Sequence, residues 1–194
     1  MYFRFSTKKT VQAAAVLLNL GRGRMDYLRL LKLLYIADRD SIARTGRPII
    51  GNRTVAMKNG PLHSEVYNLI KGEHIDAPLW SEHIRKEGYE VELVNDPGVS
   101  ELSAAEVRVL TEVSDRFALV SEWDIVEATH DFPEWAKNWP NGEGNTSHTI
   151  PFEDILEAVG LSAEKDAILD EAREDAERDR LFMRAHSHVQ PQAV

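Results

Sequence analysis

The segment spanning residues 29–65 constrains the fold of this chain more than any other part of its sequence. Nine hydrophobic side chains fall within residues 28–42, which is too many for a surface helix with a single apolar face. A helix that is hydrophobic on nearly every side lies in the core of its protein. We therefore predict a buried central helix over residues 25–44. Its charged residues gather in one narrow stripe that consists of Arg29, Lys32, Arg39 and Asp40.

Asp38 lies on the other side of this helix, among hydrophobic residues. A carboxylate that points into a core must be paired or hydrogen-bonded, because leaving it bare costs several kcal/mol. One interpretation is a structural carboxylate that clamps the next loop through arginine or backbone N–H groups. The other is an acid in a functional site. We favour the structural interpretation.

Length and composition favour a single domain. The chain has 194 residues, and 43% of them are hydrophobic, which is enough for a core. The absence of cysteine excludes disulfides, thiol catalysis and cysteine-ligated zinc. The N-terminus lacks a signal-peptide pattern, and no apolar run approaches the roughly 18 residues of a membrane span. We therefore expect a soluble, cytoplasmic protein without membrane contact.

The net charge of −9 is divided unevenly along the chain. Residues 1–58 carry a net charge of +9, and residues 59–194 carry −18. Such polarity can be satisfied inside the fold, by a partner protein, or by nucleic acid on the basic side. We favour acidic helices docking on the basic region, because no nucleic-acid recognition motif accompanies the positive charge.

Hydrophobic periodicity and capping signals predict a mainly α (α+β) fold. We expect a compact helical domain around the buried central helix, with a small antiparallel β-sheet or hairpin. Further helices are expected over residues 7–20, 61–70, 102–117, 121–129, 150–159 and 162–182. We also predict a short strand over 53–57, a hairpin within 80–94, and loops over 130–135 and 141–149. The first six residues are expected to form an edge strand or a loose arm, and the final dozen residues a disordered tail.

No catalytic or metal-binding motif is present, and we expect no cofactor, no bound metal and no enzyme activity. None of the seven histidines has a spacing that would place two imidazoles on one helix face. Neither a GxSxG nucleophile turn nor a GxxxxGK[ST] phosphate loop occurs. The enzyme alternative is a metal-dependent hydrolase that uses Asp38, His63 and His130.

Loops rich in arginine, glycine, proline and tryptophan are candidates for partner contact, since aromatic and arginine side chains are enriched in binding hot spots. Turns around residues 46–51 and 58–61 would present charges that the core does not need. The residues proposed to contact a partner are Arg47, Arg53, Lys58, His63, Glu65 and Trp135.

The segments KLLYIADR (residues 32–39), GRPI (46–49), AMKNGPL (56–62) and VY (66–67) occur in order and at close spacing. Together they resemble the Panacea family, also called the SocA-like antitoxin domain. The resemblance is strongest over residues 25–72 and extends to about residue 160 through Trp80, Leu102 and the THDFPEW segment (129–135). Its structural motif residues are Tyr35, Asp38, Arg39, Gly46, Pro48, Gly60, Pro61, Tyr67, His130 and Glu134.

The resemblance implies a mostly helical antitoxin of a toxin–antitoxin pair, which neutralises a cognate toxin by protein–protein contact. A proteolytic adaptor or scaffold is the alternative, with a protease as a possible second partner. We expect an antitoxin domain over residues 1–160, followed by an acidic helix and tail over 161–194. Nucleic acid is not expected as a partner, and the sequence does not specify the oligomeric state.

Overall fold

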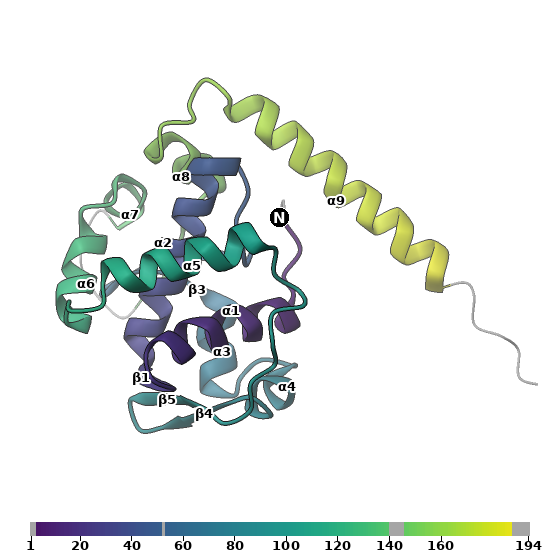
Figure 1. The fold of residues 1–194 in the computed structure, drawn as a ribbon. Helices are drawn as coiled ribbons and strands as arrows, with labels where there is room; N and C mark the ends of the chain where they lie inside the picture. Colours follow the sequence, from purple (N-terminus) through teal and green to yellow (C-terminus); the bar gives the residue numbers. More distant parts are fainter. Residues whose placement is uncertain (1–2, 52, 140–145, 188–194) are drawn as a thin grey trace, which may run out of the picture.

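The computed structural model describes residues 3–51, 53–139 and 146–187. The predicted central helix is α2, Tyr27–Thr45, and it runs through the middle of the fold, with α1, α5 and α6 packed around it (Figure 1). The Asp26 carboxylate caps its first turn by accepting a hydrogen bond from the Leu28 N–H, at 2.7 Å. Gly46 ends it in the left-handed conformation. The predicted burial of this helix is confirmed.

The other elements confirm a mainly helical fold with a small β component. The helices are α1 Thr7–Leu20, α3 Ser64–Lys71, α4 Ala77–Ser81, α5 Ala104–Arg116, α6 Glu122–His130, α7 Pro133–Asn138, α8 Phe152–Ala158 and α9 Lys165–Ser187. The strands are β1 Arg24–Asp26, β2 Thr54–Met57, β3 Gly60–His63, β4 Ile84–Glu87, β5 Glu90–Leu93 and β6 His148–Thr149. They form two antiparallel sheets, ordered β1-β5-β4 and β3-β2-β6.

The prediction of a helix from residue 61 is wrong at its start. Residues 60–63 form β3, and Pro61 pairs with Ala56 of β2 in a tight hairpin. The helix α3 begins only at Ser64. A proline can begin a helix or sit in an edge strand, because its missing N–H is tolerated in both, and here β3 is the edge strand.

Three predicted loops or ends have different outcomes. The loop expected over 130–135 is wrong in part, because α7 starts at Pro133. Within the loop expected over 141–149, residues 148–149 form β6, which pairs with β2, and residues 141–145 lie outside the described residues. No strand is assigned to residues 3–6, and most of the tail predicted to be disordered lies outside the described residues.

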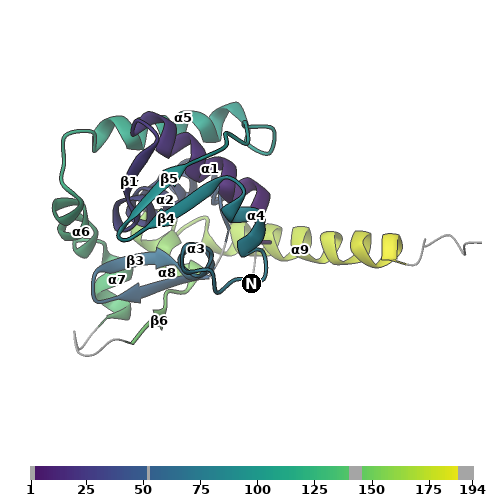
Figure 2. The same cartoon turned by 90° about the horizontal axis from the view of Figure 1, so that it is seen from below.

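The first half of the C-terminal helix α9 packs on the body. Leu169 and Ala172 are buried, and Ile168 lies against Gly46 at the end of α2. Beyond these turns α9 extends away from the body, which both views show (Figures 1 and 2). A domain boundary at residue 160 stays a prediction, and the buried first half of α9 argues that the folded body includes it.

Acidic segments dock on the basic N-terminal region, as predicted. The ion pairs that join the two regions are Lys9–Glu106, Arg24–Glu87, Arg24–Glu90, Arg39–Glu134, Arg44–Glu112, Arg47–Glu171 and Arg47–Asp175. Most are exposed and individually weak, but together they neutralise much of the charge asymmetry within the fold. Within the described residues, no helix combines the length and apolar character needed to cross a bilayer.

Candidate functional site

A cavity lies where α2, the β2–β3 hairpin and α8 meet. It has a volume of about 330 Å³. Tyr35, Asp38 and Arg39 of α2 line one side, and His63 of β3 lines the inner end. Phe3, Pro48, Ile150 and Phe152 supply apolar walls. Several residues of the predicted structural motif therefore converge on one cavity.

Asp38 clamps the turn that follows α2. Its Oδ1 accepts hydrogen bonds from the Ile49 N–H at 3.0 Å and the Ile50 N–H at 2.9 Å, and its side chain is buried. Burial raises the pKa of Asp38, whereas His63 and the backbone N–H groups favour the carboxylate and lower it. The carboxylate thus fixes the loop that begins at Gly46, which is the contact that the structural interpretation predicts.

His63 stands next to this carboxylate, with its Nε2 3.3 Å from Asp38 Oδ2. The imidazole is only 1% exposed, and burial lowers its pKa, against the opposing effect of Asp38. The Leu34 carbonyl also raises this pKa, yet neither ring nitrogen makes a well-formed hydrogen bond to any described residue. We predicted that His63 would contact a protein partner at the surface. This prediction is wrong, because β3 directs the side chain inward.

A second buried network joins α2 to α7. Glu134 Oε1 accepts hydrogen bonds from the Tyr35 hydroxyl at 3.0 Å and from Arg39 Nε at 2.8 Å. The Arg39 guanidinium also lies over the Phe132 ring, 4.3 Å from its centroid. Burial and the Glu134 carboxylate raise the pKa of the Tyr35 hydroxyl well above its ordinary value. The network ties two segments of the chain that are about 100 residues apart.

Lys32 was predicted to belong to a charged stripe, and that part of the prediction is wrong. The side chain is 0% exposed, and its Nζ donates to the Pro61 carbonyl at 2.7 Å. Burial lowers the pKa of Lys32 to about 7. Gly60 lies against this ammonium group with φ of 86°, and a side chain there would collide with Thr129 Oγ1. Lys32 therefore anchors the β2–β3 hairpin to α2.

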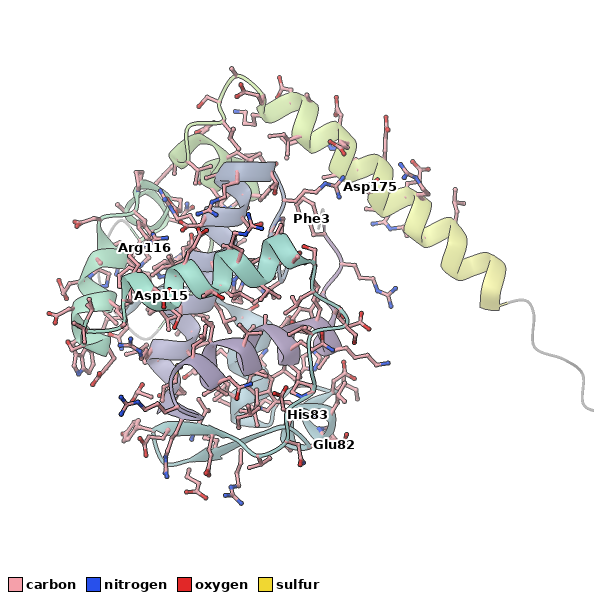
Figure 3. The ribbon with its side chains drawn as sticks, in the orientation of Figure 1. Phe3, Glu82, His83, Asp115, Arg116 and Asp175 are labelled. Carbon is pink, nitrogen blue, oxygen red and sulfur yellow. The ribbon has the colours of Figure 1, made fainter. Side chains whose placement is uncertain are left out.

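The other predicted contact residues lie in different settings. Lys58 is exposed in the turn between β2 and β3, and Arg53 is exposed where it lines the cavity. Arg47 pairs with Glu171 and Asp175 of α9, and Figure 3 shows Asp175 at the side of the molecule where Phe3 also lies. Glu65 is half-buried, and its Oε2 lies 3.6 Å from His74 Nε2.

Trp135 and Tyr67 are packed rather than freely exposed. The Trp135 indole N–H donates to the Met57 carbonyl at 3.0 Å, and its ring stacks on His130 at 4.2 Å. Tyr67 stacks on Tyr27, with 6.4 Å between centroids. His130 is thus engaged by Trp135 and does not line the cavity of Asp38 and His63. The three residues of the hydrolase alternative, Asp38, His63 and His130, are therefore not brought together in this cavity. Within the described ranges, no three or more His, Asp or Glu side chains gather as metal ligands.

Sequence reasoning missed the far wall of the cavity. Phe3 comes from the N-terminal arm, and Ile150 and Phe152 come from the segment after β6. The Phe3 and Phe152 rings meet edge to face, with centroids 5.1 Å apart. No local pattern marks these residues as neighbours of α2, because Ile150 and Phe152 lie more than 100 residues from α2 along the chain and α1 separates Phe3 from it. The pairing of β6 with β2 creates the wall.

The comparisons with known proteins give one match. A family model described as the antitoxin SocA-like Panacea domain matches residues 30–136, just over half of the chain. The matched range contains most of α2, the β2–β3 hairpin and Glu134, whereas the residues of the far wall, Phe3, Ile150 and Phe152, lie outside it. No curated protein and no solved structure matches the chain.

Proposed function

Because this chain belongs to the SocA-like Panacea antitoxin family, we propose that it neutralises a cognate toxin by direct protein–protein contact. The family match is the single observation that carries this proposal. The geometry supports a binding role, since the motif residues Lys32, Asp38 and Glu134 all make buried contacts that hold the scaffold in place. Their arrangement fixes a hairpin with charged groups at both ends.

We propose that the toxin contacts the β2–β3 hairpin. The Ser64 N–H donates to the Arg53 carbonyl at 3.1 Å, so the first turn of α3, which contains Glu65, starts beside Arg53 at one end of the hairpin. Lys58 stands exposed at the other end. Lys32 and Asp38 hold this hairpin and the preceding loop from the inside, which limits the entropy lost on binding. A rigid, charged hairpin is suited to covering the active surface of a partner.

The test of the function uses the reading frames beside the gene. Each frame is expressed alone in a bacterial host, and then together with this chain. We expect one neighbouring product to arrest growth, this chain to restore growth, and the two proteins to co-purify. If no neighbouring product is toxic, or if growth is restored without any complex, direct neutralisation is wrong.

The contact surface is tested by reversing charges on the hairpin. The double variant Arg53→Glu with Lys58→Glu is expected to weaken toxin binding by about tenfold or more, measured by calorimetry with the purified toxin. The matched control, Arg85→Glu with Lys86→Glu, reverses two exposed charges on β4 and should leave binding within about threefold. Equal effects of both variants would place the interface elsewhere.

Arg47 needs a separate control, because its guanidinium also holds α9. Arg47→Glu removes both ion pairs to α9, and Glu171→Ala with Asp175→Ala removes the same pairs while leaving Arg47 in place. If only the first variant loses toxin binding, Arg47 itself contacts the toxin. If both variants lose binding equally, the position of α9 matters, and a role of Arg47 in contact is wrong.

The extension of α9 away from the body favours the adaptor as a second candidate function (Figure 2). An adaptor would use this free half to engage a protease. Truncation after Ala176 keeps the buried Leu169 and Ala172 and removes the extended half. Under direct neutralisation the truncated chain still restores growth, and the amount of toxin in the cell stays the same. Loss of rescue together with accumulation of toxin would favour the adaptor.

A further inference from the structure

We propose that the cavity beside Asp38 and His63 binds a small, uncharged heteroaromatic compound of the nucleobase type. Such a ligand has a flat ring and one edge on which an N–H donor stands next to an acceptor. The proposal concerns a second binding site and is independent of contact with a toxin. It rests on the size, the lining and the unsatisfied polar groups of the cavity.

The volume of about 330 Å³ lies at the lower end of the range for small-molecule sites in proteins. It suits one ring system with small substituents. Phe3 and Phe152 form an aromatic corner, and Pro48 and Ile150 extend the apolar wall. Apolar and aromatic walls of this kind favour the faces of a flat ring.

The inner end of the cavity offers hydrogen bonds that the protein itself leaves unused. Asp38 Oδ1 is occupied by two backbone N–H groups, while Oδ2 faces the imidazole of His63. Both ring nitrogens of His63 lack a well-formed hydrogen bond to the described residues. A buried polar group without a partner is costly, so binding a complementary group is favourable. An N–H donor would reach the carboxylate, and an adjacent acceptor would receive the imidazole N–H.

Charge around the cavity selects against ionic ligands. Asp38 and Glu153 contribute two acidic groups to the lining, and Arg39 and Arg53 contribute two basic groups. With His63 neutral, the formal charges cancel. An anion would meet Asp38 at the inner end, and a cation would meet the two guanidinium groups. An uncharged ring with a polar edge avoids both penalties.

His63 lines the cavity, but its side chain is only 1% exposed and both ring nitrogens are covered. A ligand therefore reaches them when the ring turns slightly toward the cavity. The Tyr35 ring, 5.9 Å from the imidazole, bounds this movement on the α2 side. Ligand contact would give His63 a better-aligned hydrogen bond than the one that Asp38 offers at 3.3 Å, and the bound protein is expected to be more stable than the free protein.

The test uses the full chain with adenosine, guanosine, cytidine and uridine as probes, followed by thermal unfolding and calorimetry. Ribose and indole are the comparison compounds, since ribose lacks the ring and indole lacks the donor–acceptor edge. At ten times its Kd, a bound nucleoside should raise Tm by about 3 °C or more, whereas ribose should not. The proposal is overturned if no nucleoside binds at millimolar concentration, or if indole binds as tightly as the best nucleoside.

Two variants test the polar edge, and a third is the matched control. Asp38→Asn keeps an oxygen for the Ile49 and Ile50 N–H groups but replaces the ligand-facing acceptor with a donor. His63→Phe keeps a ring and removes both nitrogens. Each should weaken nucleoside binding at least tenfold. His83→Phe changes a histidine next to β4, which is well separated from Phe3 in Figure 3, and should leave binding unchanged.

Should His63→Phe fail to fold, Asp38→Asn alone decides the question. Unchanged nucleoside binding in a folded Asp38→Asn protein would overturn the proposal. The result of the growth-rescue assay with the toxin plays no part in this decision. The ligand site and the antitoxin role can therefore fail separately.

Discussion

Replacing Lys32 by methionine tests whether a buried amine is neutral in the folded protein. Burial lowers the pKa of Lys32 from 10.5 to about 7. Between these values the unfolded chain holds a proton that the folded protein has released. Unfolding therefore takes up a proton, and the free energy of unfolding rises with pH by about 1.4 kcal/mol per pH unit. This effect spans the window from about pH 7 to about pH 10.5.

The expected magnitude follows from the two pKa values. Between pH 7.5 and 9.5 the Lys32 side chain contributes a gain of about 2.5 kcal/mol to the free energy of unfolding of the native sequence. Lys32→Met lacks this gain. The variant also leaves the Pro61 carbonyl without its donor, which costs about 1 to 3 kcal/mol at every pH. The two effects are separable because only the first depends on pH.

The assay is urea unfolding at pH 7.5, 8.5 and 9.5, followed by tryptophan fluorescence. The free energy of unfolding of the native protein should rise relative to that of Lys32→Met by about 2 to 3 kcal/mol over this range. Lys58→Met changes an exposed lysine and should run parallel to the native protein. Parallel curves for Lys32→Met as well would show that the buried amine keeps its proton, and the reasoning from burial would be refuted.

Three further predictions concern the buried networks. Gly60→Ala should lower the free energy of unfolding by about 3 kcal/mol, because of its positive φ and a steric collision, whereas Gly88→Ala, with positive φ in open space, should cost about 1 kcal/mol in the same urea assay. Glu134→Ala should cost about 3 to 5 kcal/mol, since it removes the buried anion that pairs with Arg39 and accepts from the Tyr35 hydroxyl. Glu92→Ala breaks an exposed pair and should cost under about 1 kcal/mol. Burial lowers the pKa of His63, so the unfolded chain binds a proton before the folded protein does as pH falls below 6.5. The free energy of unfolding of the native protein should therefore fall below this pH, and that of His63→Gln should fall less.

Local patterns in the sequence predicted the elements that depend on neighbours along the chain. The dense apolar run of residues 28–42 identified α2, and the capping box of Ser103 and Glu106 identified the start of α5, where both reciprocal hydrogen bonds are present. The buried position of Asp38 followed from helical periodicity. Each of these signals lies within a few residues of the structure that it determines.

The features that the sequence did not predict depend on distant contacts. Lys32 belongs to a charged stripe by periodicity, yet the Pro61 carbonyl and the packing of α6 bury it. His63 lies inward because Gly60 and Pro61 form a strand, which sets its side of the hairpin. The wall formed by Phe3 and Phe152 joins both ends of the domain. Hydrophobic periodicity within one segment does not predict contacts between residues that are far apart along the chain.

The residues that carry the family resemblance are mostly buried, and this limits what they can recognise. Asp38, Glu134 and Gly60 hold the hairpin and the preceding loop from within, whereas a partner can touch only exposed side chains. The motif therefore specifies the scaffold, and under the proposed function the choice of partner depends on exposed residues such as Arg53 and Lys58. Changing these two is expected to alter partner binding at nearly constant stability. Changing Asp38 to a side chain without an acceptor should unfold the loop before partner binding is affected.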